Sequence, residues 1–130
     1  MSKFQDYQKF VNNHPALKAI GNTPIVQLDL PFEIGKAQLF AKCENLNPGG
    51  SIKDRPIMAM IVQAILSGKL DKSKTILDAT SGNAGISYAM IGSMLGFNVT
   101  LVMPENASEE RKKRIIAHGA NIIFTDAMLG

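Results

Sequence analysis

Residues 75–85 read Thr-Ile-Leu-Asp-Ala-Thr-Ser-Gly-Asn-Ala-Gly, an apolar run followed at once by small and polar residues. Its first half is typical of a buried strand, and the pattern after it predicts a helix with Ile86, Ala89 and Met90 on one side. A helix that starts directly after a strand presents unpaired backbone N–H groups and the positive end of its dipole. The turn at 80–85 is therefore a candidate site for a carboxylate.

Other interpretations of this turn are an ordinary helix cap, a Walker loop and a dinucleotide-binding turn. Thr80, Ser81 or Asn83 could simply cap the helix, because these residue types are good N-caps. One capping residue would be enough, however, and the turn carries several polar and glycine positions. The sequence does not fit a Walker loop, since no Gly-Lys-Ser/Thr follows, and it lacks the G-x-G-x-x-G spacing of a dinucleotide-binding turn.

The chain beyond this turn is regular. Strand starts are expected at equal intervals, at Thr75, Asn98 and Asn121, and each intervening helical pattern is closed by a glycine, Gly96 or Gly119. Alternating strands and helices predict an α/β fold, a three-layer parallel sheet with helices on both faces. Ligands of such sheets bind beyond the carboxyl ends of the strands. The strands are expected at 76–79, 99–103 and 122–125.

A second motif lies upstream, where residues 47–56 read Asn-Pro-Gly-Gly-Ser-Ile-Lys-Asp-Arg-Pro. The glycine turn delivers Lys53 to the start of a helix expected over about 55–67. A lysine held there can be desolvated and can attack a carbonyl group as an amine nucleophile. Taken alone, the segment favours an ordinary basic residue, but the turn at 80–85 shifts the balance toward a functional lysine. Asp54 and Arg55 are expected to form structural pairings.

Composition excludes several classes of protein. With 45% hydrophobic and 19% charged residues, the chain is globular rather than disordered. Its single cysteine, Cys43, permits no internal disulfide and suits the reducing cytoplasm. No apolar run is long enough to span a membrane. The basic run at 111–114 is expected to be a solvated helix face, not a nucleic-acid site, and no residue spacing suggests a metal site.

The two motifs at 47–55 and 80–85 closely resemble those of the cysteine synthase and cystathionine β-synthase family, which are pyridoxal-phosphate enzymes of fold type II. The likeness extends to Gly-Asn-Thr-Pro at 21–24 and Met-Pro-Glu-Asn-Ala-Ser at 103–108, in the family's order. One departure is Ala84, where many members have threonine, so that only its backbone N–H remains for the substrate.

The resemblance implies pyridoxal 5'-phosphate as the cofactor and an amino acid as the small-molecule substrate. Lys53 would hold the cofactor covalently and, once released, move the α-proton of the substrate. Asn83 would hydrogen-bond the phenolic oxygen of the cofactor ring. The substrate carboxylate would be bound by Thr80, Ser81, Gly82, Asn83 and Ala84.

The resemblance also implies a domain arrangement. Residues 48–130 would form the small substrate-binding domain. Residues 1–47, with candidate strands at 25–30 and 39–44, would belong to a large domain whose remainder lies outside this sequence. The N-terminal segment is therefore expected to pack less securely. These 130 residues alone are expected to bind the cofactor poorly and to be inactive, and the full-length protein is expected to be a homodimer.

The activity implied for the parent enzyme is a β-replacement that makes L-cysteine from an activated serine, O-acetylserine or O-phosphoserine, and a sulfur donor. A cystathionine β-synthase or a serine dehydratase would use much the same first half. A third interpretation is an inactive module that recruits a partner such as serine acetyltransferase. Sulfide-dependent cysteine formation would separate the enzymes, and partner binding without cofactor binding would indicate the module.

Overall fold

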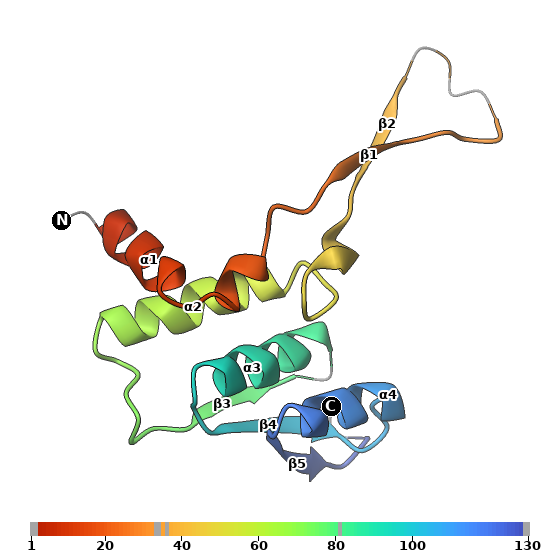
Figure 1. The fold of residues 1–130 in the computed structure, drawn as a ribbon. Coiled ribbons are helices and arrows are strands. Elements are labelled where there is room, and N and C mark those ends of the chain that lie inside the picture. The colour runs from red at the N-terminus through yellow and green to blue at the C-terminus, as the bar shows by residue number, and fades with distance from the viewer. Residues whose placement is uncertain (1–2, 33–34, 36, 81, 129–130) are drawn as a thin grey trace.

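The computed structural model describes the chain except for residues 1–2, 33–34, 36, 81 and 129–130. Two bodies can be followed in Figure 1, a helical and parallel-stranded body and a hairpin that stands out from it. In chain order the elements are α1 (Lys3–Asn12), the 3-10 helix η1 (Leu17–Ala19), β1 (Ile25–Leu28), β2 (Leu39–Lys42), the 3-10 helix η2 (Glu44–Leu46), α2 (Asp54–Leu66), β3 (Ile76–Ala79), α3 (Asn83–Met94), β4 (Val99–Pro104), α4 (Glu109–Ala117) and β5 (Asn121–Thr125).

The strands β3, β4 and β5 form a parallel sheet in that order. Ile76 pairs with Val99 across the first ladder, and Thr100 pairs with Asn121 across the second. The α/β class and the predicted strands are confirmed, with boundaries that differ by at most one residue. The glycine stops are confirmed too, since Gly96 and Gly119 both have positive φ, +68° and +80°.

The core lies between this sheet and its helices. Along β4 the residues Val99, Leu101 and Met103 are buried, and they alternate with less buried ones, as expected for a strand covered on one face. Right-handed crossovers in the order β3-β4-β5 place α3 and α4 on the same face. The side chains of Leu77 and Ile123, on the other face, stay 67% and 53% exposed, so within the described chain helices cover one face of this sheet.

The N-terminal segment divides into a packed part and an exposed part. Leu17 of η1 is fully buried, and Ile20 is 6% exposed, so the start of the chain joins the core. The strands β1 and β2 pair only with each other, antiparallel, with Ile25 opposite Lys42. Strand β2 ends earlier than expected because η2 begins at Glu44, and β1 also ends before residue 30. Both strands are mostly exposed. Less secure packing is thus confirmed for the hairpin but not for the residues before it.

Candidate functional site

The loop that carries Lys53 is held by hydrogen bonds that its backbone N–H groups donate. The Gly50 N–H donates to the carbonyl of Asn47 (2.7 Å), and the Gly49 N–H donates to the Asp54 carboxylate (2.6 Å). The Lys53 N–H donates to the Ser51 hydroxyl (3.2 Å), and Lys53 is the residue directly before α2. The predicted position of the lysine at a helix start is therefore confirmed.

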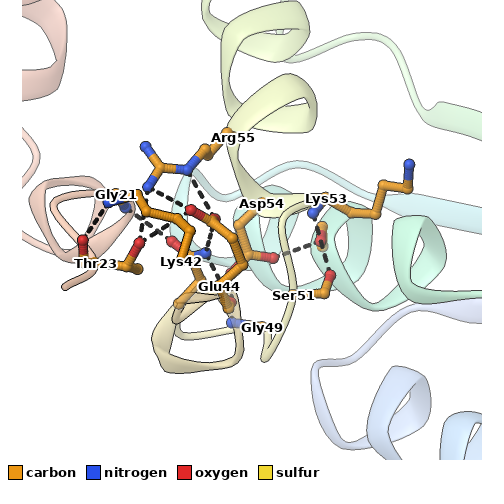
Figure 2. Close-up of polar contacts among 11 residues, drawn as sticks. Gly21, Thr23, Lys42, Glu44, Gly49, Ser51, Lys53, Asp54 and Arg55 are labelled. Carbon is orange, nitrogen blue, oxygen red and sulfur yellow. Dashed lines mark hydrogen bonds and ion pairs between the residues drawn. The ribbon is translucent and has the colours of Figure 1, made fainter. Parts of the chain in front are cut away.

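The side chain of Lys53 behaves differently from its backbone. It is exposed, and among the described residues its amine forms no hydrogen bond or ion pair. Figure 2 shows the chain of methylenes extending away from the polar contacts that hold the loop. An amine mounted on a rigid backbone, but not engaged by the protein, is available for a ligand.

The second predicted turn connects β3 to α3. The Thr80 N–H continues the sheet ladder by donating to the carbonyl of Val102 (2.9 Å), and Gly82 is the N-cap of α3. The Gly82 N–H donates to the Thr80 hydroxyl (3.3 Å). Asn83 follows as the first helical residue and is exposed, and Ala84 is half-buried. Ser81, the remaining predicted carboxylate ligand, lies outside the described residues.

A buried carboxylate brings the two turns together. Asp54, in the first turn of α2, is fully buried and accepts a hydrogen bond from the hydroxyl of Ser87 (2.5 Å), one turn into α3. Ser87 Oγ is also 3.1 Å from the carbonyl oxygen of Asn83. The loop of Lys53 and the turn of Asn83 are therefore adjacent, joined through Asp54 and Ser87.

A hydrogen-bonded cluster around Glu44 supports the lysine loop from its other side (Figure 2). Arg55 binds the Glu44 carboxylate in a bidentate manner, at 2.8 and 2.9 Å. Thr23 Oγ1 (3.0 Å) and Asn47 Nδ2 (2.7 Å) donate to the same carboxylate. The hydrogen bonds from Arg55 lower the pKa of Glu44 from 4.5 to about 2. The Gly21 N–H, which donates to Asn47 Oδ1 (2.9 Å), completes the link from the 21–24 motif to α2.

These contacts clarify the expected pairings of Asp54 and Arg55. Both side chains have structural partners, as predicted, but the two do not pair with each other. Arg55 turns toward Glu44, and Asp54 turns toward the glycine loop and α3. The side chains of successive helical residues point about 100° apart, so those of Asp54 and Arg55 contact different parts of the fold.

The basic run at 111–114 differs from its prediction. Arg114 reaches from α4 to the carbonyl of Gly49 (2.9 Å), and Lys112 donates to the carbonyl of Glu105 (2.6 Å) and lies over the ring of Phe124. Only part of the run is therefore a solvated face. Gly49 lies 65 residues from Arg114 in the sequence, and a charge run carries no information on such a distant contact.

A hollow of about 400 Å³ opens at the carboxyl ends of the strands, where a ligand was expected. It is bordered by the turn after β3 and by the ends of β4 and β5. Its lining residues are Ala79, Thr80, Gly82, Val102, Met103, Pro104 and Thr125. In the described part of the chain, no group of His, Cys, Asp or Glu side chains could hold a metal ion. No described helix is both long and apolar enough to cross a bilayer.

A family model described as "Pyridoxal-phosphate dependent enzyme" matches residues 16–129. The chain belongs to this family. A cysteine synthase of Aquifex aeolicus (strain VF5) is 49% identical to it over 117 residues, which cover 88% of this chain and 36% of that enzyme. A cystathionine beta-synthase of Apis mellifera is 44% identical over 126 residues, 95% of this chain and 25% of that protein.

Solved structures agree with this assignment. The crystal structure of cysteine synthase from Entamoeba histolytica matches with a TM-score of 0.83 and 37% identity, over 90% of this chain and 36% of that one. The chain thus spans about a third of the length of these two cysteine synthases. The predicted resemblance and its fold type are confirmed.

The residues present fit the cofactor of the family. Lys53 offers an exposed primary amine, the group that can form an imine with the aldehyde of pyridoxal phosphate. Asn83 offers an exposed amide, which can donate a hydrogen bond to a ring oxygen. Asp54 and Ser87 join the two turns. The sequence did not assign them to the site, because the two residues lie 33 positions apart and no local pattern connects them.

Proposed function

We propose that the full-length protein, of the length of its relatives, makes L-cysteine by pyridoxal-phosphate-dependent β-replacement. The substrates would be an activated serine, O-acetylserine or O-phosphoserine, and a sulfur donor. One observation carries the proposal. The amine of Lys53 stands unengaged on a rigid loop, and a buried carboxylate joins that loop to the start of α3. The cysteine synthases among the relatives support the choice of reaction.

In this proposal each residue of the two turns has a role. Lys53 Nζ holds the cofactor and later carries the α-proton of the substrate, while Asn83 orients the cofactor ring. Thr80, Ser81, Gly82, Asn83 and Ala84 bind the substrate carboxylate. Their position suits this role, because backbone N–H groups in the first helical turn lack intrahelical partners and attract anions. When bound, the cofactor supplies the electron sink for the reaction, and the protein supplies orientation and proton transfer.

The proposal extends to the organisation of the full-length protein. Residues 48–130 form its small substrate-binding domain, and residues 1–47 belong to a large domain. The exposed hairpin of β1 and β2 supports this division, since its apolar side chains find no cover within the described chain. The full-length protein is a cytoplasmic homodimer with an amino-acid substrate, and serine acetyltransferase is a candidate partner.

Covalent labelling of Lys53 tests the function. The full-length protein is incubated with pyridoxal 5'-phosphate and reduced with borohydride, and the labelled lysine is identified by mass spectrometry. We expect the label on Lys53 and its loss, together with sulfide-dependent cysteine formation, in Lys53→Ala. Lys69→Ala, at an exposed lysine just after α2, serves as the matched control and should keep both. Labelling at another lysine in the wild type would contradict the assignment.

The cystathionine beta-synthase of Apis mellifera, 44% identical to this chain, makes that activity the second candidate. Both reactions would use Lys53 in the same way, so labelling does not separate them. Sulfide-dependent cysteine formation by the full-length protein separates them and is the outcome expected here. Its absence, with Lys53 still labelled, would favour the second candidate.

A further inference from the structure

The carboxylate of Asp54 is buried without a counter-ion. It is fully buried, and among the described residues no lysine, arginine or histidine forms an ion pair with it. A buried charge is costly unless hydrogen bonds satisfy it. Two neutral donors do so here, the backbone N–H of Gly49 at 2.6 Å and the hydroxyl of Ser87 at 2.5 Å. A buried carboxylate that has just these two donors within the described chain needs an explanation beyond packing.

The first donor closes the lysine loop. The Gly49–Asp54 hydrogen bond spans the residues that lead into Lys53, and the loop passes over the carboxylate so closely that no side chain fits at position 49. A Cβ placed on Gly49 would lie 2.2 Å from Asp54 Oδ1. The carbonyl of Gly49 is held in turn by Arg114 of α4 (2.9 Å). The backbone around Lys53 therefore has one well-defined path.

The second donor ties that loop to the other turn. Ser87 is buried inside α3, and its oxygen lies 2.5 Å from Asp54 Oδ1 and 3.1 Å from the carbonyl oxygen of Asn83. The carboxylate thus contacts the loop of Lys53 with one oxygen and the first turn of α3 with the other. The two contacts fix the lysine and the asparagine relative to each other.

We propose that Asp54, acting through Ser87, is a positioning residue that holds the amine of Lys53 and the turn of Asn83 in register for one shared ligand. This inference rests on the proposed function, because it assumes that both residues serve the same cofactor. Asp54 itself does not touch the reacting atoms in this proposal. Its contribution is geometric, and errors of about 1 Å in such placement cost on the order of 100-fold in rate.

Three substitutions test the geometry. Ser87→Ala removes the contact to α3 and leaves the Gly49 contact, whereas Asp54→Ala removes both. Asp54→Asn keeps both, because its oxygen can accept from Gly49 while its NH₂ donates to Ser87 Oγ, which then donates to Asn83. Val62→Ala, at a fully buried position in α2 well away from the loop, is the control for lost stability.

The measurements are made on the full-length protein with pyridoxal 5'-phosphate as the probe. One is the rate of covalent capture at Lys53 by borohydride reduction, and the other is the induced circular dichroism of the bound cofactor relative to its absorbance, which reports how the ring is held. We expect capture to slow by about tenfold or more in Ser87→Ala and Asp54→Ala, with a reduced dichroism ratio. Asp54→Asn and Val62→Ala should retain the wild-type ratio.

The outcomes separate the two proposals. Wild-type capture rates and dichroism in Ser87→Ala would overturn the positioning role and leave the proposed function intact, as would an equal loss in Val62→Ala. A loss in Asp54→Asn as large as in Asp54→Ala would also overturn it, because charge rather than placement would then matter. Wild-type protein that captures no cofactor at Lys53 would instead contradict the proposed function.

Discussion

Glu44 is the residue on which the N-terminal part of the chain depends. Its carboxylate accepts hydrogen bonds from Arg55, Thr23 and Asn47, which come from separate segments. Asn47 also binds the backbone of Gly21 (2.9 Å), so that the 21–24 motif is tied to the loop before Lys53. Bidentate pairing with arginine is the strongest of these contacts and explains the low pKa of Glu44.

The low pKa of Glu44 predicts how stability depends on pH. In the unfolded chain this carboxyl should titrate near its ordinary pKa of 4.5, and in the folded chain near about 2. The stabilisation is therefore fully present above pH 4.5 and is lost as the pH falls from there toward about 2. Urea denaturation of the wild type and Glu44→Gln should show a difference in midpoint at pH 7 that shrinks steadily below pH 4.5.

A pH-independent difference between the two proteins would contradict the assigned pKa. Glu109→Gln is a suitable control, because Glu109 is exposed and pairs only locally with Lys112 on α4. Exposed pairs of this kind contribute little to stability, because water and salt screen them. We expect a much weaker change in midpoint for this control across the same range of pH.

Single residues also mark the limit of prediction from sequence. The positions of Lys53 and Asn83 at the starts of helices could be predicted, because each stands in a turn with a recognisable local pattern. Asp54 and Ser87 could not, since their contact depends on how α2 packs against α3. Arg114 was missed for the same reason, as its partner, Gly49, lies in another element.

Among the elements, α3 packs closely on the sheet. A Cβ on Gly92 would lie 2.3 Å from Val99 Cγ2 and 3.6 Å from Ile76 Cδ1, so at this position the helix backbone packs directly on the side chains of β4 and β3. The helix is buried on most of its surface, because α2 and α4 also pack against it. Its position fixes the turn at Asn83 relative to the sheet.

We predict that Gly92→Ala lowers the free energy of unfolding by about 1–3 kcal/mol, the usual cost of overpacking. Val99→Ala removes the methyl group that the new Cβ would meet. The double mutant should therefore lose less stability than the sum of the single mutants, since the two substitutions interact directly. Denaturant titrations of the four proteins measure this coupling, and strict additivity would contradict the close contact.

The helices and strands from β3 to β5 were the easiest elements to predict. The strands β3, β4 and β5 follow one another at equal spacing, and the glycine that ends each helix could be read directly. The pairing of β1 with β2 was not predicted, because two short strands separated by a connection can join any sheet edge. Their antiparallel ladder, with Leu28 opposite Leu39, is a finding of the structure.

At the scale of the whole molecule, the hairpin of β1 and β2 stands apart from the α/β body (Figure 1). Ile25 and Phe40, on its strands, are 64% and 55% exposed. Large apolar side chains gathered on one element usually mark a surface that another part of a protein covers. The proposed large domain would supply that cover.

We therefore predict that one double substitution has little effect on residues 1–130 alone but destabilises the full-length protein. Ile25→Lys with Phe40→Lys should change the stability of residues 1–130 by no more than about 0.5 kcal/mol, because both sites are already exposed. In the full-length protein the same change buries two unpaired charges and should sharply reduce soluble yield and thermal stability. Calorimetry of both chains checks this.

Leu28→Lys with Leu39→Lys, a cross-strand pair on the same hairpin, is a second test of the same expectation. If either double substitution left the full-length protein as stable as the wild type, residues 1–47 would not belong to a large domain. Loss of stability in the short chain alone would point instead to a role for the hairpin in the body described here.

The close approach of Gly49 to Asp54 restricts which sequences can build this loop. Alanine at position 49 would overlap the carboxylate, and alanine at position 54 would leave the Gly49 N–H without its acceptor. A substitution at either position therefore affects which residues the other position tolerates. A library randomised at both sites and selected for folding should return glycine together with aspartate or asparagine more often than the separate frequencies of these residues would give.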